Sequence, residues 1–327
     1  MIISKTPLRV SFFGGGTDIP EFYQQNKFGG AVLGTSIDKY IYHSVFKFPS
    51  KLFDYNTRIS YSKVECVDNV SSIEHTPFRE ILNYMKIKKD VEIHIASDLP
   101  SFSGLGTSSS FTVGLLKALH EYKNKDITKK NLAKTAIHIE RNILNEAVGC
   151  QDQTFAAFGG FNLIEFKNDN IKVNPLRLSS DRMKEFSNSL MLFYTGIKRR
   201  AHKIESEKIK NINNISDNLN KILKHVQLGF DILDSNQDLS KFGYLLHETW
   251  KEKRSLSSGV SNKIIDSMYD NAVSSGALGG KLLGAGGGGF LLLYVPEEKK
   301  EKIRKALSSF NEISFSINTL GSKIIHK

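Results

Sequence analysis

The feature that most constrains this chain is a loop rich in glycine and serine between a predicted strand and a predicted helix. Residues 91–95 alternate strictly between apolar and polar side chains, which indicates a half-buried strand, and residues 111–122 have the pattern of a helix. Between them, Gly104 and Gly106 let the backbone approach a ligand, and the helix start offers unpaired N–H groups to an anion. The pattern favours a phosphate-binding loop; the alternative is a flexible loop whose serines cap the helix. The hydroxyls available for phosphate oxygens or a magnesium ion are those of Thr107, Ser108, Ser109 and Ser110.

The composition excludes a disordered chain and limits the number of domains. The 327 residues suffice for two domains or one two-lobed unit, and 40% hydrophobic with 24% charged residues support a sizeable core. Lysine and arginine number 45 against 34 acidic residues, and the net charge of +11 favours anionic partners: nucleic acid, phosphorylated small molecules or acidic surfaces. Because the basic residues are spread along the chain without a nucleic-acid module, we expect no nucleic-acid partner.

Cysteine content and apolar segments indicate the compartment. Cys66 and Cys150 are too few for a disulfide framework or a four-cysteine zinc site, and they suit a reducing environment. The first residues lack the apolar segment of a signal peptide, and the longest apolar run, residues 290–295, is too short to span a membrane. We therefore expect a cytoplasmic protein without a membrane partner.

Predicted strands and helices are mixed without strict alternation, which indicates an α+β fold. The chain changes character near residues 175–185, so we divide it into an N-terminal lobe, 1–178, and a C-terminal lobe, 179–327. The predicted strands are residues 2–12, 37–48, 91–95, 155–166 (as a strand or hairpin), 190–194, 290–295 and 313–317. The predicted helices are residues 111–122, 128–147 with Thr128 as N-cap, long helices within 201–234, 238–252, 261–275 and a lysine-rich helix before the last strand.

Two further glycine loops flank the first one described. Gly284-x-Gly286-x-x-Gly289 has the spacing of a dinucleotide fingerprint, but it leads into a strand, whereas a Rossmann loop opens into a helix. A P-loop also fails, because Lys281 is followed by leucine. A tight hairpin and a ligand site remain equally good interpretations. In the other loop, Arg9 and Asp18 flank a glycine turn, and they form either a contact to a polar ligand or a structural ion pair.

Two carboxylates stand out between these loops. Glu140 lies on the apolar stripe of the helix that begins after Thr128, so it needs a cation, a metal or several donors. The alternative is a buried ion pair, for instance with Arg141. Asp152 follows a polar break in the chain, where it is either a general base or simply a turn residue.

The three loops in this order, with Asp152 between the second and the third, resemble the motifs of the GHMP small-molecule kinase superfamily. The matching segments are Pro7-x-Arg9-x4-Gly14, Pro100-x3-Gly104-Leu105-Gly106-Thr107-Ser108 and Lys281-x2-Gly284-Ala285-Gly286-x-Gly288-Gly289. Within the superfamily the chain is most similar to the bacterial D-glycero-D-manno-heptose 7-phosphate kinases, through residues 14–18, 149–153 and 250–257.

The resemblance implies a two-lobed fold that uses ATP and Mg²⁺ and transfers the γ-phosphoryl group to a hydroxyl, here the anomeric one. It implies that Asp152 is the catalytic carboxylate, that Arg9 stabilises the transferred phosphoryl group and holds Asp152 ionised, and that Ser108 and Glu140 bind the metal. The implied nucleotide-binding residues are Pro100, Ser103, Gly104, Leu105, Gly106, Thr107, Ser108, Ser109 and Ser110. The implied sugar-binding residues are Gly15, Gly16, Thr17, Asp18, Gln151, Lys198, Arg199, Arg254, Gly284, Ala285, Gly286 and Gly287.

Departures from the family motifs restrict which sugar the chain is expected to phosphorylate. Galactokinase-like members have Glu-His at the position of Gly15-Gly16, so galactokinase activity is not expected. Thr107 replaces the usual serine and Ser109 the usual alanine, which leaves open which of Thr107, Ser108 and Ser109 meets the metal.

A phosphorylated sugar also needs a basic clamp, and a solvated basic face is the alternative for each candidate. The candidates are Lys198, Arg199, Arg200, Lys251, Lys253 and Arg254. The partners implied are a small sugar phosphate and ATP, and the chain is expected to be a monomer or homodimer. Rival interpretations are an anomeric kinase for fucose or unphosphorylated heptose, a non-catalytic sugar sensor, and an anionic-surface binder.

Overall fold

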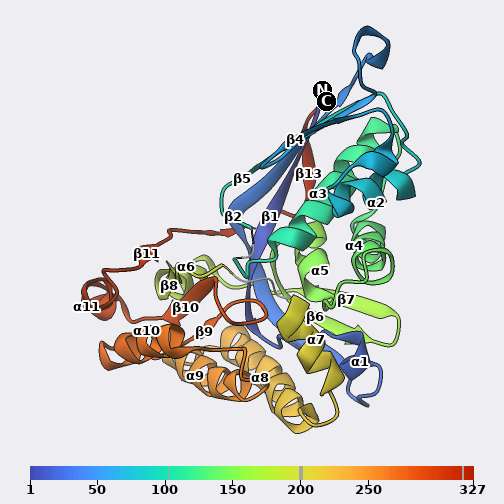
Figure 1. Ribbon diagram of the computed structural model, residues 1–327. Coiled ribbons are helices and arrows are strands. Elements are labelled where there is room, and N and C mark those ends of the chain that lie inside the picture. The colour runs from blue at the N-terminus through green and yellow to red at the C-terminus, as the bar shows by residue number, and fades with distance from the viewer. Residues whose placement is uncertain (102, 199–201, 319) are drawn as a thin grey trace.

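The structure is a computed structural model that describes residues 1–101, 103–198, 202–318 and 320–327. Two sheets organise these residues (Figure 1). The first has nine strands, with the order β13-β1-β2-β5-β3-β4 along its main path and with β12, β6 and β7 joined to it through β2 and β6. The second has four strands in the order β11-β8-β10-β9. The α+β prediction is therefore confirmed.

The first sheet is built around two long antiparallel strands, β1 (Ile2–Phe13) and β2 (Gly30–Lys47). One half of β2 pairs with β5 (Val91–Ser97) and the other half with β6 (Phe161–Lys167), so two branches of the sheet diverge from it. The remaining elements of this region are α1 (Pro20–Tyr23), β3 (Thr57–Ser60), β4 (Val64–Val67), α2 (Thr76–Tyr84) and β7 (Asn170–Pro175).

Helix α3 (Thr107–Tyr122) follows β5 through the glycine- and serine-rich loop, which confirms the predicted strand–loop–helix order. It begins four residues before the predicted start at 111. Figure 1 shows α2, α3, α4 and α5 on one face of the sheet. Leu115 and Leu119 of α3 pack there against Val91 and Ile93 in one apolar cluster, so the burial of this face fixes where the loop stands.

Helix α4 (Lys129–His138) begins after Thr128, whose hydroxyl accepts a hydrogen bond from the Asn131 N–H, as predicted for an N-cap. The helix continues as a π-helical segment, Ile139–Ile143, and ends there; the predicted end at 147 is wrong. Such a π-segment places an extra residue in the turn and is frequent at functional sites. Here it carries Glu140.

The strand or hairpin predicted for residues 155–166 is partly wrong. Residues Gln151–Phe158 form helix α5, which ends at Gly159, and only Phe161–Lys167 form a strand. An apolar run such as Phe155-Ala156-Ala157 is buried on all sides, and its periodicity does not separate a helix from a strand.

The second half of the chain builds the second sheet and its helices. Figure 1 shows helices α8 to α10 beside the sheet and α11 at its outer end. The elements are α6 (Ser180–Asn188), β8 (Leu190–Tyr194), α7 (His202–Lys210), α8 (Ser216–Asp234), α9 (Ser240–Arg254), α10 (Lys263–Ser274), β9 (Gly279–Leu282), β10 (Phe290–Tyr294), α11 (Lys300–Ala306) and β11 (Asn311–Glu312).

The strand predicted at residues 313–317 is wrong in its position. The chain instead forms β12 (Ile317–Asn318), which pairs with β2, and β13 (Lys323–His326), which pairs with β1. The two termini therefore lie together in Figure 1. The last ten residues return to the first sheet, so sequence order and spatial order differ at this end of the chain.

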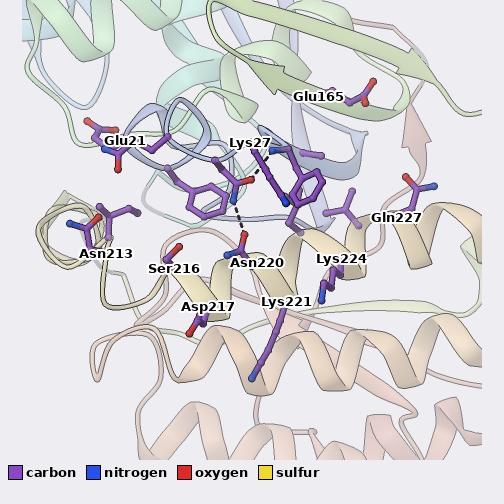
Figure 2. Close-up of a pocket in the computed structure, with 18 of the residues that line it drawn as sticks. Glu21, Lys27, Glu165, Asn213, Ser216, Asp217, Asn220, Lys221, Lys224 and Gln227 are labelled. Carbon is purple, nitrogen blue, oxygen red and sulfur yellow. Dashed lines mark hydrogen bonds between the residues drawn. The ribbon is translucent and has the colours of Figure 1, made fainter.

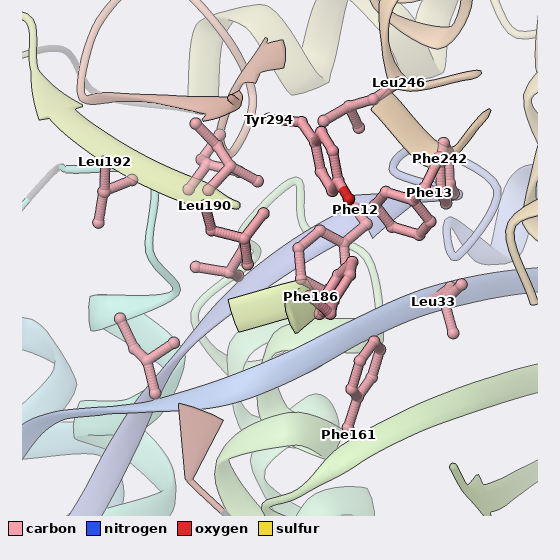
Figure 3. Packing of buried hydrophobic residues seen from close by; sticks show 14 of the residues in the cluster. Phe12, Phe13, Leu33, Phe161, Phe186, Leu190, Leu192, Phe242, Leu246 and Tyr294 are labelled. Carbon is pink, nitrogen blue, oxygen red and sulfur yellow. The ribbon is translucent and has the colours of Figure 1, made fainter. Parts of the chain in front are cut away.

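Aromatic side chains from both halves of the chain meet at the end of β1 (Figure 3). The rings of Phe186 and Phe242 each lie 5.4 Å from that of Phe12, and Phe161 lies 5.5 Å from it. This cluster holds the turn after β1 against α6 and α9. Within the described residues, no helix is long and apolar enough to cross a membrane.

Candidate active site

Arg9 and Asp152 form a partly buried ion pair between β1 and α5. Arg9 lies on β1, and Asp152 lies in the first turn of α5. The guanidinium donates from Nε to Oδ1 at 2.8 Å and from Nη2 to Oδ2 at 2.7 Å, the bidentate geometry that gives the strongest carboxylate pairs. Asp152 keeps 25% of its side chain exposed, whereas Arg9 is buried. The alternative in which Arg9 pairs with Asp18 is wrong.

The phosphate-binding loop predicted from the glycines packs directly on this pair. Arg9 donates from Nη1 to the Gly104 carbonyl at 2.6 Å, and its backbone N–H donates to the Leu105 carbonyl at 3.0 Å. Gly106 has a φ of +75°, and a Cβ there would lie 3.3 Å from Asp152 Oδ2. Both facts favour glycine at this position. Arg9 thus connects the loop to the carboxylate.

The third glycine loop joins β9 to β10, and its backbone closely approaches that of the second loop. A Cβ on Gly284 would lie 2.6 Å from Gly104 Cα, and a Cβ on Gly104 would lie 2.5 Å from the Leu283 carbonyl oxygen. Strands β9 and β10 pair as a hairpin, as one of the two interpretations predicted. The loop region also packs against the other two glycine loops. The motif segments, separated by up to 270 residues, meet at one place.

Glu140 is buried, and only one of its two carboxylate oxygens accepts hydrogen bonds among the described residues. Its Oε2 accepts hydrogen bonds from Ser109 Oγ at 2.8 Å and from Gln153 Nε2 at 2.6 Å. Its Oε1 is buried without a hydrogen-bond partner among the described residues. Burial raises the pKa of Glu140 to about 7. The alternative of an ion pair with Arg141 is wrong, because that guanidinium bonds to Glu21 at 2.6 Å.

The hydroxyls at the start of α3 differ in their surroundings. Ser109 is buried on Glu140, and Ser110 donates to the Pro7 carbonyl at 2.8 Å. Thr107 is buried and shares a hydrogen bond of 3.3 Å with Ser103. Ser108 is exposed.

The first loop holds Asp18 beside the catalytic candidates. Asp18 is buried, and it accepts hydrogen bonds from the Gly16 N–H, the Gln151 N–H and the Gln151 side-chain amide, at 3.0 to 3.1 Å. Burial, and then the charge of Asp152, raise the pKa of Asp18 to about 6. Thr17 is buried within the turn, where its hydroxyl donates to the Gly14 and Ala31 carbonyls. Gly15 and Gly16 are partly exposed.

Of the predicted basic clamp, Lys253 lies beside the third glycine loop, whereas Arg254, Lys198 and Lys251 have other surroundings. Arg254 lies 3.5 Å from Asp266 and faces helix α10. Lys198 is exposed, and Lys251 pairs with Glu248 at the surface. Arg199 and Arg200 lie outside the described residues.

Sequence reasoning missed three buried lysines beside the third loop. Lys281 appeared only as part of a motif, Lys253 only as one candidate in a basic cluster, and Lys208 not at all. One signal was present: Leu246, Trp250 and Lys253 follow at spacings of four and three, so Lys253 belongs to the buried stripe of α9.

A cavity of about 1140 Å³ lies apart from this centre, between α1, α8 and the start of β2 (Figure 2). It is lined by amide and charged side chains such as Asn220, Lys221 and Lys224, and the Asn26 side chain donates to Asn220 across it at 2.6 Å. Arg9 and Asp152 do not line it. The contacts among the loops, rather than the volume of a cavity, therefore identify the candidate active site.

Comparison with known proteins assigns the family. Residues 70–160 match the GHMP kinases N terminal domain, and residues 231–313 match the GHMP kinases C terminal domain. The chain is 34% identical to the D-glycero-alpha-D-manno-heptose 7-phosphate kinase of Campylobacter jejuni over 94% of its own length and 93% of the relative's. The chain belongs to the GHMP kinases. The resemblance read from the three loops is thereby confirmed.

Other relatives of this GHMP kinase include sugar kinases. The crystal structure of a D-glycero-D-manno-heptose 1-phosphate kinase from Bacteroides thetaiotaomicron has a TM-score of 0.79 at 25% identity, and covers 100% of this chain and 99% of that one. The L-fucokinase/L-fucose-1-P guanylyltransferase of Bacteroides fragilis is 25% identical over 94% of this chain, which spans only 36% of that enzyme. The predicted fold is confirmed, and so is the prediction of an ATP-dependent sugar kinase.

Proposed function

We propose that this GHMP kinase transfers the γ-phosphoryl group of ATP to the anomeric hydroxyl of D-glycero-D-manno-heptose 7-phosphate, which yields the 1,7-bisphosphate. The observation that carries the chemistry is the bidentate Arg9–Asp152 pair, packed against a glycine loop at a helix N-terminus. The acceptor is inferred from the Campylobacter jejuni relative, which matches nearly the whole chain.

The nucleotide site is proposed at the second loop. Helix α3 begins after Gly106 without a side-chain cap, and the first N–H groups of a helix have no partner within it, so they and the positive end of the helix dipole attract phosphate oxygens. Gly104 and Gly106 let that backbone approach the phosphates, since no side chain intervenes. Pro100, Ser103 and Leu105 shape the loop, and residues 107–110 supply the hydroxyls.

Glu140 and Ser108 are proposed to hold Mg²⁺. The buried Glu140 Oε1 without a partner is the kind of oxygen that a hard cation would occupy, and the exposed Ser108 hydroxyl is free of the bonds that engage Ser109 and Ser110. When bound, Mg²⁺ would neutralise charge on the phosphate groups during transfer. Within the described residues no cluster of three metal-binding side chains occurs, which fits a metal held by one carboxylate, a hydroxyl and phosphate oxygens.

Asp152 is proposed to accept or orient the proton of the acceptor hydroxyl. The guanidinium of Arg9 fixes the orientation of this carboxylate through two hydrogen bonds. Because Arg9 also donates to the Gly104 carbonyl, the base and the phosphate loop keep a fixed separation. Phosphoryl transfer asks the protein mainly for such positioning and charge neutralisation.

Asp18 and Gln151 are proposed to bind hydroxyls of the sugar. They lie next to Asp152 in the structure, and Gly15 and Gly16 leave space where galactokinase-like members have large side chains. Gly284, Ala285, Gly286 and Gly287 would complete the acceptor pocket from the opposite lobe. Thr17, with its hydroxyl engaged inside the turn, would act by shaping the loop.

The test is a measurement of ATP consumption with Mg²⁺ across unphosphorylated sugars and sugar 6- and 7-phosphates, with product masses. We expect the wild type to add a second phosphate to heptose 7-phosphate. Asp152→Asn should lower kcat by about 10²–10⁴-fold, the usual contribution of a positioned base. The matched control is Asp169→Asn, in the exposed turn between β6 and β7, which should leave kcat unchanged.

Two outcomes would contradict the proposal. Turnover of L-fucose or of unphosphorylated heptose alone would show that the acceptor is another sugar. The similarity to the L-fucokinase/L-fucose-1-P guanylyltransferase of Bacteroides fragilis makes fucose the second candidate. Nucleotide binding without turnover of any sugar would exclude the proposed acceptor and support the sensor interpretation.

A further inference from the structure

Three lysine side chains are buried beside the third glycine loop. Lys208 lies on α7, Lys253 on α9 and Lys281 on β9, and each residue is less than 5% exposed. Lys253 donates to the Leu282 and Gly284 carbonyls at 2.7 and 2.6 Å. Lys208 donates to the Ala285 carbonyl at 2.9 Å, and Lys281 donates to the Phe12 carbonyl at 2.8 Å. Two ammonium groups therefore bind the backbone of residues 282–285, and the third, from β9, binds the end of β1.

This cluster has more positive than negative charge. A buried ammonium is costly unless a carboxylate or several acceptors compensate it. Among the described residues, only Glu205 forms an ion pair with one of the three, at 3.1 Å from Lys208. Lys253 and Lys281 bond to neutral carbonyls, and an ammonium has three N–H donors, so donors remain unused on both. Glu205 thus compensates one of the three positive charges, and Lys253 and Lys281 form no ion pair among the described residues.

The electrostatic surroundings agree with this geometry. Burial, and then the charge of Lys281, hold the pKa of Lys253 well below its ordinary value. Burial, and then the charge of Arg9, lower the pKa of Lys281 to about 7. Asp18 raises the pKa of Lys281, so this lysine lies within electrostatic range of both Arg9 and Asp18, and Lys253 lies within range of Arg9.

The position of the cluster relates it to the acceptor. Lys281 reaches the Phe12 carbonyl, two residues before the turn that leads to Asp18. Glu205, which pairs with Lys208, is also close enough to contribute to the raised pKa of Asp18. The lysines thus lie on the Asp18 side of Arg9. The metal carboxylate Glu140 lies with Ser109 of α3, on the nucleotide side.

We propose that Lys208, Lys253 and Lys281 form the subsite for the phosphate group that the acceptor already carries, an inference that rests on the proposed function. A phosphate dianion would supply the missing negative charge and accept the unused N–H donors. The same chemistry would suit the γ-phosphate of ATP, but the side occupied by Asp18 favours the acceptor. The proposed clamp is therefore buried, and of the basic residues that the sequence indicated it includes only Lys253.

The experiment uses Lys208→Met and Lys281→Met in the full chain. Lys281 forms no ion pair among the described residues, and replacing its buried charge by an apolar side chain of similar length should allow the variant to fold, whereas Lys208→Met also removes the ion-pair partner of Glu205 and should be less stable. The matched control is Lys251→Met, on the same helix as Lys253 but 56% exposed and paired with Glu248. Thermal unfolding of each variant is measured first. Steady-state kinetics then give kcat and KM for heptose 7-phosphate, for unphosphorylated heptose and for ATP.

We expect the KM for heptose 7-phosphate to rise about 10- to 100-fold in both variants, the loss that one charged hydrogen bond gives. The kcat/KM for unphosphorylated heptose and the KM for ATP should stay within about threefold. Equal losses for both acceptors would overturn the proposal and leave the lysines as supports of the loop. A rise confined to the KM for ATP would also overturn it and assign them to the nucleotide.

A binding measurement separates this inference from the proposed function. Calorimetric titration with inorganic phosphate and with heptose 7-phosphate, without nucleotide, needs no turnover. If the wild type binds these phosphates and the lysine variants do not, the subsite stands even where heptose 7-phosphate is not phosphorylated. If the wild type phosphorylates heptose 7-phosphate and the variants bind it as tightly, the subsite is wrong and the function stands.

Discussion

At the scale of single residues, the candidate site is a set of charges that would be unfavourable in isolation. Arg9 compensates Asp152, but Glu140 and Asp18 are buried with amide, hydroxyl and N–H donors instead of cations. Each therefore has a raised pKa and each is suited to a ligand that brings positive charge or hydroxyl groups. The unfavourable burial of these two carboxylates therefore occurs where a bound ligand would compensate it.

The pH dependence of stability follows from Glu140. Burial raises its pKa from the ordinary 4.5 to about 7, so between these values the folded protein holds a proton that the unfolded chain releases. This contribution to stability is complete below about pH 4.5 and is lost as the pH rises through about 7. Glu140→Gln keeps the shape and removes the titration. Without Mg²⁺ we expect the variant to match the wild type at pH 5 and to be more stable by roughly 2 kcal/mol at pH 8.

Urea unfolding in the presence of a chelator at pH 5 and pH 8 measures this difference. Asp18 titrates in both proteins, so subtraction isolates Glu140. Glu298→Gln, at an exposed position, should change stability equally at both pH values. A difference between Glu140→Gln and the wild type that does not depend on pH would contradict the assignment. With Mg²⁺ and ATP, we expect Glu140→Gln to lose at least about 100-fold in kcat.

At the scale of elements, the turns were predictable, but several helices were not, among them α2, α5 and α6. Local residue patterns predicted the glycine loops, the Thr128 cap and the strand–loop–helix unit around residue 104. Helix α5 was missed because its residues are buried on every side and carry no period. The pairing of Arg9 with Asp152 was expected only through the resemblance, because 143 residues separate them and local patterns do not report such contacts.

The second loop gives a prediction at this scale. Gly106→Ala places a Cβ 3.2 Å from Arg9 Cγ and 3.3 Å from Asp152 Oδ2, at a φ of +75°. We expect a loss of stability of about 1–2 kcal/mol from the left-handed backbone. We also expect kcat to fall about tenfold or more, because the ion pair or the loop must move. Kinetics and urea unfolding of the purified variant measure both quantities.

Gly196→Ala is the matched control for that variant. Gly196 has the same φ of +75°, and a Cβ there would meet no atom within 4 Å. The control therefore carries the backbone strain without the contact at the ion pair, and it should lose stability while kcat is maintained. Equal losses of kcat in the two variants would show that strain alone, rather than displacement of Arg9 and Asp152, explains the effect.

At the scale of the whole molecule, two features couple the halves of the chain. Strands β12 and β13 return from the second half to pair with β2 and β1, which local patterns did not indicate because two- and four-residue strands carry little signal. The aromatic cluster around Phe12 joins β1 to α6 and α9. Both features act on β1, the strand that carries Arg9. The two halves should therefore unfold together, and the active site should lose its geometry in that one transition.

Phe186→Ala tests this coupling. The ring of Phe186 is fully buried, 5.4 Å from Phe12, 4.9 Å from Phe242 and 5.6 Å from Phe161, so its loss leaves a cavity between the halves. We expect a destabilisation of about 3–5 kcal/mol in urea. The single tryptophan, Trp250 on α9, reports on the second half by fluorescence, while circular dichroism follows all helices. If the halves are coupled, both probes give one midpoint in the wild type and in the variant. Separate midpoints in the wild type would contradict the coupling, and Phe28→Ala, whose ring is 71% exposed, should shift neither probe.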